Sequence, residues 1–129
     1  MQAQRPERTA DSREIVVIDD EPDILDVLAD VLRDEGYSPV VFRDGFEALD
    51  YLRDHRPSLV LSDLRLPSMS GQEFIAKLRS LHGPSLPVVV MSGAVTSDIA
   101  QTLSIQAVLL KPFELDAFLA LVNRWARSQ

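Results

Sequence analysis

Short apolar runs, separated by longer amphipathic stretches, restrict the folds open to this chain more than any other feature of its sequence. The clearest runs occupy residues 15–18, 59–61, 86–91 and 107–110. Each is too short for a helix, and none shows the polar alternation of a strand with one face in water. Strands that are covered by helices on both faces have this composition, so the runs predict a parallel sheet inside a layered α/β fold.

A fifth and weaker strand is predicted over residues 40–42. Pro39 stands at its start, and proline has no backbone N–H to donate to a neighbouring strand. We therefore place this strand at an edge of the sheet, where one side of the strand needs no partner.

Amphipathic helices are predicted between the strands. Apolar residues recur at helical spacing within 24–31, 48–52, 74–81 and 115–125. Two of these helices have a capping-box spacing at their start, which pairs Asp44 with Glu47 and Ser70 with Glu73. The segment 96–103 offers barely two turns of apolar spacing, so we expect the fourth helix to be short or irregular.

Together these elements predict one domain of five βα units, in which a doubly wound parallel sheet of five strands carries helices on both faces. A length of 129 residues suits one such domain and leaves little room for a second. We assign residues 14–127 to this domain and expect residues 1–13 to form a disordered N-terminal tail.

Charge and composition argue against several kinds of partner and site. The formal net charge is −7, which disfavours direct binding to nucleic acid or to an anionic membrane surface. Because there is no cysteine, disulfides and thiolate metal sites are excluded. We find neither the apolar stretch of a signal peptide nor a run of membrane-spanning length. We therefore expect a cytoplasmic protein.

Polar side chains follow the ends of four predicted strands: Asp19 with Asp20, then Asp63, Ser92 and Lys111. The carboxyl ends of parallel strands meet at one edge of a sheet, where ligands bind in folds of this type. Three carboxylates held together there would repel one another unless a cation joined them. Mg²⁺ prefers hard oxygen ligands and combines readily with phosphate oxygens. We therefore predict a magnesium site that can receive a phosphoryl group.

These residue types suggest separate roles. Asp63 stands alone at a central strand end and is the candidate nucleophile, which would form an aspartyl phosphate. Lys111 and the metal would stabilise the charge of the phosphoryl group during transfer. Ser92 offers a hydroxyl, and Gly93 an unobstructed backbone N–H, to the bound group. A cis bond between Lys111 and Pro112 would aim the lysine inward.

Each signal also has an ordinary structural interpretation. An Asp-Asp pair before a helix usually caps it, and a lone aspartate after a strand usually occupies a turn. The joint placement of the signals at four strand ends argues against these separate explanations. His55 and His82 lie near predicted helix C-termini, where the helix dipole suits them, so we give them no catalytic role.

Four motifs carry a resemblance to a known family. They are VIDDEP at 17–22, SDLRLPSMSG at 62–71, MSG at 91–93 and LKPF at 110–113. Through them, nearly the whole chain resembles a response-regulator receiver domain of two-component signalling. The resemblance implies a flavodoxin-like fold with the strand order 2-1-3-4-5.

The resemblance also implies how the site works. Asp63 would take a phosphoryl group from the phosphohistidine of a sensor histidine kinase or a phosphotransfer protein. Asp20, Asp63 and the backbone carbonyl of Arg65 would hold Mg²⁺ or Mn²⁺, with Asp19 acting through water. Such a domain is not an enzyme in the usual sense, because it assists only its own phosphorylation and dephosphorylation.

By the same resemblance, Ser92 and Lys111 would bind the phosphoryl group and move the loops after their strands. The family usually carries an aromatic ring three residues before the lysine, at the switch position where this chain has Val108. The stretch from Ser92 to Lys111 is also shortened. We expect normal phosphorylation of Asp63 and a signal read through a reshaped or mobile fourth-helix region. Since only a short polar end follows Trp125, output would come from contacts with a downstream protein, made by a monomer or weak homodimer.

Three other functions stay open. A flavodoxin-type FMN module shares the architecture, but the acidic Asp19, Asp20 and Glu21 replace the phosphate cradle that it needs after its first strand. An aspartate-based phosphatase also uses a carboxylate nucleophile and magnesium, but characteristically in an Asp-x-Asp pattern after the first strand. A pseudo-receiver that is never phosphorylated and serves as a docking surface agrees with Val108, although the remaining site residues are complete.

Overall fold

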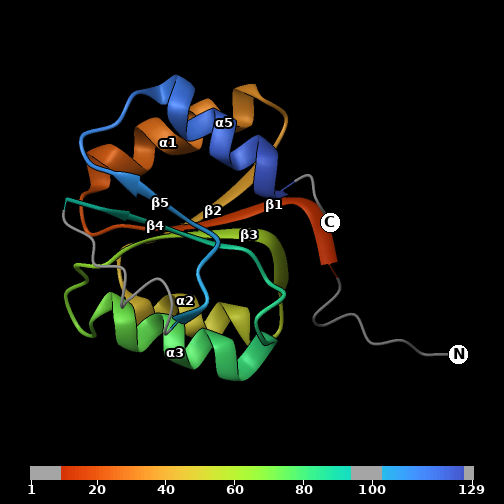
Figure 1. Ribbon diagram of the computed structural model, residues 1–129, viewed down its shortest axis with the longest axis vertical. Helices are drawn as coiled ribbons and strands as arrows, with labels where there is room; N and C mark the ends of the chain where they lie inside the picture. The colour runs from red at the N-terminus through yellow and green to blue at the C-terminus, as the bar shows by residue number, and fades with distance from the viewer. Residues whose placement is uncertain (1–9, 94–102, 127–129) are drawn as a thin grey trace, which may run out of the picture.

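A parallel sheet of five strands forms the centre of the molecule in a computed structural model that describes residues 10–93 and 103–126 (Figure 1). Its order is β2-β1-β3-β4-β5, as predicted. The strands are β1 (Ala10–Ile18), β2 (Ser38–Phe42), β3 (Arg56–Asp63), β4 (Val88–Ser92) and β5 (Ala107–Leu110). The strand that contains Pro39 lies at an edge of the sheet, which confirms that prediction.

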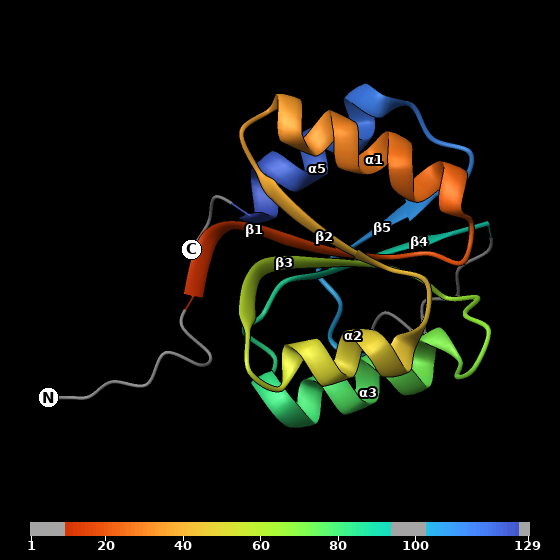
Figure 2. The same ribbon diagram turned by 180° about the vertical axis from the view of Figure 1, so that it is seen from behind.

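Helices cover both faces of the sheet (Figures 1 and 2). One face carries α1 (Pro22–Asp34) and α5 (Leu115–Ala126), and the other carries α2 (Gly45–Leu52) and α3 (Gly71–His82). The fourth helix that was predicted within 96–103 lies outside the described residues apart from its last one, Leu103. Its short or irregular form therefore stays a prediction.

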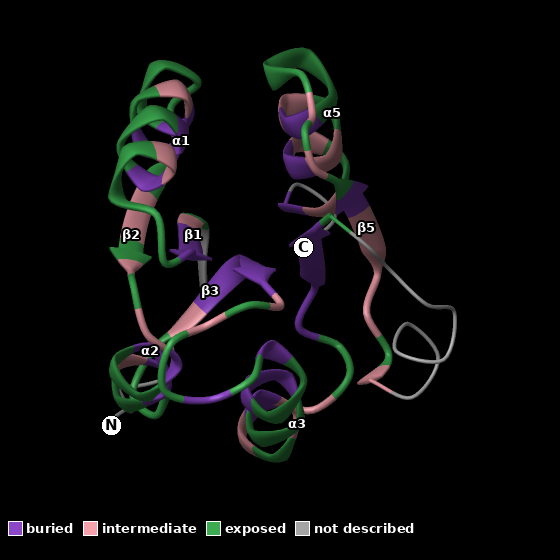
Figure 3. Ribbon diagram, turned by 90° about the vertical axis from the view of Figure 1, so that its left-hand side faces the viewer, coloured by how far each residue is buried: buried purple, intermediate pink, exposed green. Residues whose placement is uncertain are grey.

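The central strands divide the apolar core into two layers, because successive side chains of a strand point to opposite faces. In β1, Ile15 and Val17 pack beneath α1 and α5, whereas Val16 and Ile18 pack against α2 and α3. All four side chains are fully buried, and Figure 3 shows the buried interior between the helix layers. Burial on both faces is the reason for the uniformly apolar runs.

The two predicted helix caps are present. Asp44 caps α2, since its Oδ1 accepts hydrogen bonds from the N–H groups of Phe46 at 2.6 Å and Glu47 at 3.2 Å. Ser70 caps α3, since its Oγ accepts from the N–H of Glu73 at 3.0 Å. These side chains satisfy N–H groups that have no partner inside the first turn of a helix.

The first strand begins earlier than the apolar pattern predicts. Residues 10–13 were expected in a disordered tail, but they belong to β1, where Ala10 pairs with Arg56 of β3. Backbone pairing needs no apolar side chain, so a polar strand end leaves no mark in the hydropathy pattern. Residues 1–9 lie outside the described part of the chain, and the rest of the division into tail and domain stays a prediction.

The last two strands show how closely their bounds follow the apolar runs. β5 coincides with the predicted run 107–110, whereas β4 begins at Val88, two residues after the predicted start. Pro87, directly before it, has no N–H for a ladder. Within residues 10–93 and 103–126, no helix combines the length and hydropathy needed to cross a membrane.

Candidate functional site

The predicted site residues gather at the carboxyl end of the sheet. Asp19 directly follows β1, Asp63 and Ser92 are the last residues of β3 and β4, and Lys111 directly follows β5. The strands β1, β3, β4 and β5 are neighbours in the sheet, so their ends lie side by side. Asp19, Asp63 and Ser92 are buried, whereas Asp20 is exposed.

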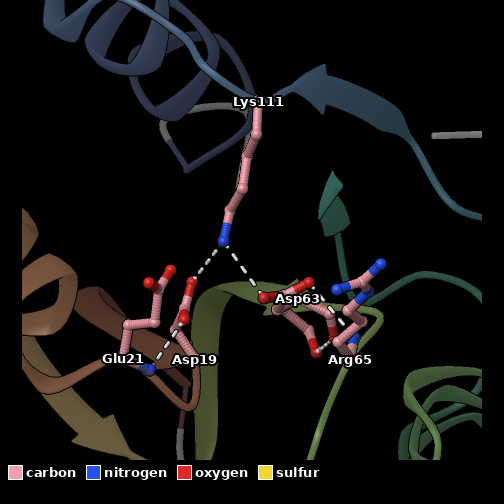
Figure 4. A network of polar contacts seen from close by, with 6 residues as sticks. Asp19, Glu21, Asp63, Arg65 and Lys111 are labelled. Carbon is pink, nitrogen blue, oxygen red and sulfur yellow. Dashed lines mark hydrogen bonds and ion pairs between the residues drawn. The ribbon is translucent and has the colours of Figure 1, made fainter. Parts of the chain in front are cut away.

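Three carboxylates share this site with one ammonium group. Asp19, Asp20 and Asp63 each offer an oxygen within 4.8 Å of the other two. Lys111 Nζ donates hydrogen bonds to Asp19 Oδ2 at 2.8 Å and to Asp63 Oδ2 at 3.0 Å (Figure 4). One ammonium offsets only one of three negative charges, so a further cation would relieve the remaining repulsion. A donor set made of oxygen alone suits Mg²⁺ better than a softer ion.

Lys111 is held in its charged form. Partial burial lowers the pKa of its ammonium, but the hydrogen bonds and negative charges of Asp19 and Asp63 together outweigh this effect and raise the pKa above its ordinary value. The Lys111-Pro112 peptide bond is cis. The backbone N–H of Lys111 donates to the Ser92 carbonyl at 2.7 Å, which joins the ends of β4 and β5.

Backbone N–H groups hold the other oxygens of the two buried carboxylates. Asp63 Oδ1 accepts a hydrogen bond from the N–H of Arg65 at 3.1 Å, and Asp19 Oδ1 accepts one from the N–H of Glu21 at 3.0 Å (Figure 4). Ser62 Oγ donates to the Asp63 carbonyl at 2.8 Å. Hydrogen bonds to a charged acceptor are among the stronger ones, so both carboxylates are fixed in orientation.

A cleft of about 700 Å³ opens above these groups. It is lined by Asp20, Glu21, Asp63, Leu64, Arg65, Ser92, Gly93 and Lys111. The structure therefore brings together every predicted metal-binding and phosphoryl-binding residue, with the fully buried Asp19 in contact with Lys111. Val108 is not among the lining residues. It lies within β5, where it pairs with Val90 of β4.

Some contributors to the site were given no role from the sequence, and Leu64 of the cleft lining is one of them. Glu21 adds a further acidic side chain to the cleft lining, and its place beside the Asp pair was the available signal. Gly71 begins α3 and lies against the loop after the candidate nucleophile. Its N–H donates to the Leu64 carbonyl at 3.0 Å, and a Cβ at position 71 would stand 2.5 Å from Leu64 Cα. Gly71 ends the SDLRLPSMSG motif at 62–71, but the motif alone does not show that this glycine lies against Leu64.

The two histidines lie away from the cleft. His82 is buried, with Nε2 2.7 Å from the Leu52 carbonyl. His55 is exposed, with Nδ1 2.8 Å from the Tyr51 carbonyl. Neither lines the cleft, and both contacts are with the backbone of α2.

Sequence comparison gives one family. Residues 15–123 match the family described as response regulator receiver domain. The chain is 36% identical over 113 residues to the DNA-binding response regulator MtrA of Mycolicibacterium smegmatis. The matched stretch covers 84% of this chain and 48% of that protein. It is also 36% identical over 111 residues to the DNA-binding transcriptional regulator NtrC of Klebsiella pneumoniae, and that match covers 84% of this chain and 24% of that protein. The chain thus spans about half of the first relative and about a quarter of the second.

Solved structures share the fold. A CheY-like response regulator receiver domain protein from Methanospirillum hungatei superposes with a TM-score of 0.84 at 24% identity, covering 90% of this chain and 94% of that one. The receiver domain of the Pseudomonas aeruginosa sensor histidine kinase PA1611 has a TM-score of 0.81 at 24% identity and covers 89% and 98%. That structure has a magnesium ion coordinated in its active-site cleft.

Proposed function

This chain belongs to the response-regulator receiver domain family of two-component systems, and we propose that Asp63 accepts a phosphoryl group in the presence of Mg²⁺ and so switches a protein-binding surface. One observation carries the proposal: Lys111 Nζ contacts both Asp19 and Asp63 within a cluster of three carboxylates. That arrangement combines a nucleophilic oxygen, a fixed cation and ligand oxygens for a metal, which are the components of phosphoryl transfer to a carboxylate.

The donor set is suited to a hydrated magnesium ion. Asp20, Asp63 and the backbone carbonyl of Arg65 would hold it, and the fully buried Asp19 would act through a bound water. When bound, the ion would offset the negative charge of the phosphoryl oxygens. Asp20 is exposed, so it is accessible to an ion that keeps several of its waters.

The protein groups have defined tasks in the transfer. An oxygen of Asp63 forms a bond to phosphorus while the bond from phosphorus to the donor imidazole nitrogen breaks, and that nitrogen keeps the electron pair. The N–H of Arg65 holds the carboxylate in orientation at 3.1 Å. Lys111, 3.0 Å from Asp63 Oδ2, offsets charge on the phosphoryl oxygens. Ser92 and Gly93 would bind the transferred group from the cleft wall.

The implied donor is the phosphohistidine of a sensor histidine kinase or a phosphotransfer protein, and the implied receiver of the signal is a downstream protein in the cytoplasm. Val108 offers no aromatic ring to follow the movement of Ser92. We therefore propose that the signal is read from the region that follows Gly93. The reaction is the chain's own phosphorylation and hydrolysis, without turnover of a separate metabolite.

The decisive experiment is phosphotransfer from a phosphohistidine donor and from acetyl phosphate, with Mg²⁺ and with EDTA. Wild type should acquire a hydroxylamine-labile phosphoryl label only with Mg²⁺. Asp63→Asn should not, whereas Asp54→Asn, which changes an exposed aspartate after α2, should be labelled like wild type. No labelling of wild type under any condition would favour the pseudo-receiver. Steady hydrolysis of added phosphomonoesters would favour the phosphatase.

A further inference from the structure

The guanidinium group of Arg79, on α3, binds the chain that leads into β5. Its Nε donates a hydrogen bond to the Leu103 carbonyl at 3.1 Å. Its Nη2 donates to the Ser104 carbonyl at 2.7 Å and to Gln106 Oε1 at 3.3 Å. Three contacts within residues 103–106 thus attach the entrance of β5 to α3, and Figure 1 shows this part of the chain beside that helix.

The same side chain also binds the end of its own helix and the residues before β4. Arg79 Nη1 donates to the Gly83 carbonyl at 2.8 Å and to the Leu86 carbonyl at 2.7 Å. A guanidinium group has five N–H donors in a rigid planar fork, and the five contacts use all of them. Every acceptor is an uncharged oxygen. Lysine could not reproduce this geometry, because its ammonium is a single point on a flexible stem.

Gln106 extends the attachment to β4. Its backbone N–H donates to the Val88 carbonyl at 2.9 Å, while its side-chain Oε1 accepts from the Val88 N–H at 2.7 Å. The beginning of β5 is therefore bound to the beginning of β4 and, through Arg79, to α3. Arg79 does not line the cleft above Asp63 and Lys111.

β5 needs such an attachment because it is short and lies at the edge of the sheet. It has four residues and, among the strands of residues 10–93 and 103–126, pairs only with β4, so hydrogen bonds on one side determine its register. A slip of one residue would turn each of its side chains to the opposite face. Lys111 directly follows this strand, and its ammonium must meet two carboxylates at 2.8 and 3.0 Å.

We propose that Arg79 is a positioning residue for Lys111: it fixes the place and register of β5, from whose end Lys111 reaches Asp19 and Asp63. Arg79 binds the beginning of β5, whereas Lys111 follows its end. At about 3.3 Å per residue, the two ends of this strand lie about 13 Å apart. The inference rests on the proposed function, because the position of Lys111 matters only if Lys111 meets the phosphoryl group.

The test compares Arg79→Gln with Arg56→Gln. Arg56 is a matched control because it lies beside the same end of α3 and donates to the His82 carbonyl at 3.2 Å and to Ser85 Oγ at 3.0 Å. Within residues 10–93 and 103–126, these hydrogen bonds of Arg56 go to the end of α3 and the loop after it, not to β5 or its entrance. Both variants lose one guanidinium group and keep a polar side chain.

The first measurement is amide hydrogen exchange of the protein without ligands. The N–H groups of Gln106 and Lys111, which bind β4 at the two ends of β5, should exchange about tenfold faster or more in Arg79→Gln. They should be unchanged in Arg56→Gln. Wild-type exchange of both amides in Arg79→Gln would overturn the inference.

The second measurement is the affinity for beryllofluoride, a phosphoryl mimic, at saturating Mg²⁺, together with the affinity for Mg²⁺ alone. Arg79→Gln should weaken beryllofluoride binding about tenfold and leave Mg²⁺ binding unchanged. It should add no further loss to Lys111→Met, since residues that act through one another are not additive. Equal losses of both affinities, or additive losses in the double variant, would overturn the inference. If wild type does not bind beryllofluoride, the proposed function fails, while amide exchange still decides whether Arg79 holds β5.

Discussion

Replacing Gly71 by alanine should deform the loop that carries the nucleophile. Gly71 is the first residue of α3. A Cβ at this position would stand 2.5 Å from Leu64 Cα and 2.7 Å from the Asp63 carbonyl oxygen, whereas ordinary contacts begin at 3.4 Å. Both neighbours are backbone atoms and cannot rotate away. Either α3 or the loop must therefore move by roughly 1 Å, as in an overpacked core.

Two opposing effects determine how far Gly71→Ala changes the free energy of unfolding. Alanine in place of glycine in a helix contributes up to about 1 kcal/mol of stability, while overpacking costs about 1–3 kcal/mol. We expect the free energy of unfolding to fall by roughly 1–2 kcal/mol. The same displacement would shift the Asp63 side chain and the Arg65 carbonyl, so Mg²⁺ affinity should fall about tenfold or more.

Gly45→Ala is the matched control. Gly45 is also buried and also begins a helix, α2, but the nearest atoms that a Cβ there would meet are flexible ones of Met69 at 3.1 Å, followed by the Phe74 ring at 3.5 Å. The methionine side chain can adapt, so the change in stability should stay within about 0.5 kcal/mol. Urea denaturation and calorimetric Mg²⁺ titration would measure both variants. Equal stability and equal Mg²⁺ affinity in the two would refute the close approach of α3 to the loop.

Three further predictions concern ionisable side chains. Asp20→Asn should raise the unfolding free energy of the metal-free protein by about 1 kcal/mol, because it removes one of three crowded charges. The same change should abolish stabilisation by Mg²⁺. Thermal melts with EDTA and with Mg²⁺ measure the two effects. The pKa of Lys111 is raised in the folded protein, so its charged form contributes to the free energy of unfolding. This contribution is complete below the unfolded pKa of 10.5 and is lost as pH rises through the folded pKa. In urea denaturation up to about pH 11, the free energy of unfolding should therefore fall less with pH in Lys111→Met than in wild type. His82→Ala should lower the free energy of unfolding by about 1–3 kcal/mol, because it removes a buried partner of the Leu52 carbonyl. His55→Ala should lower it little. Neither substitution should change phosphorylation of the protein.

Interactions between residues close in the chain were predictable. The bounds of β5, the caps Asp44 and Ser70, and the edge position of the strand with Pro39 all depend on a side chain and its immediate neighbours. The gathering of Asp19 and Asp63 with Lys111 was predictable as well. Every strand runs the same way, so residues that follow strands must meet at one edge.

Other features depend on segments that meet only in the folded molecule. The polar start of β1 and the five contacts of Arg79 leave no periodicity, cap spacing or composition that a reader of the chain could detect. Gly71 follows the predicted cap Ser70 and ends a motif, but neither feature shows that it approaches Leu64. Arg79 and Ser104 are 25 residues apart, and their contact exists because α3 and the entrance of β5 pack on the same side of the sheet. Repeating patterns report which face of an element is buried, whereas the partner that a single side chain meets depends on how the elements pack in three dimensions.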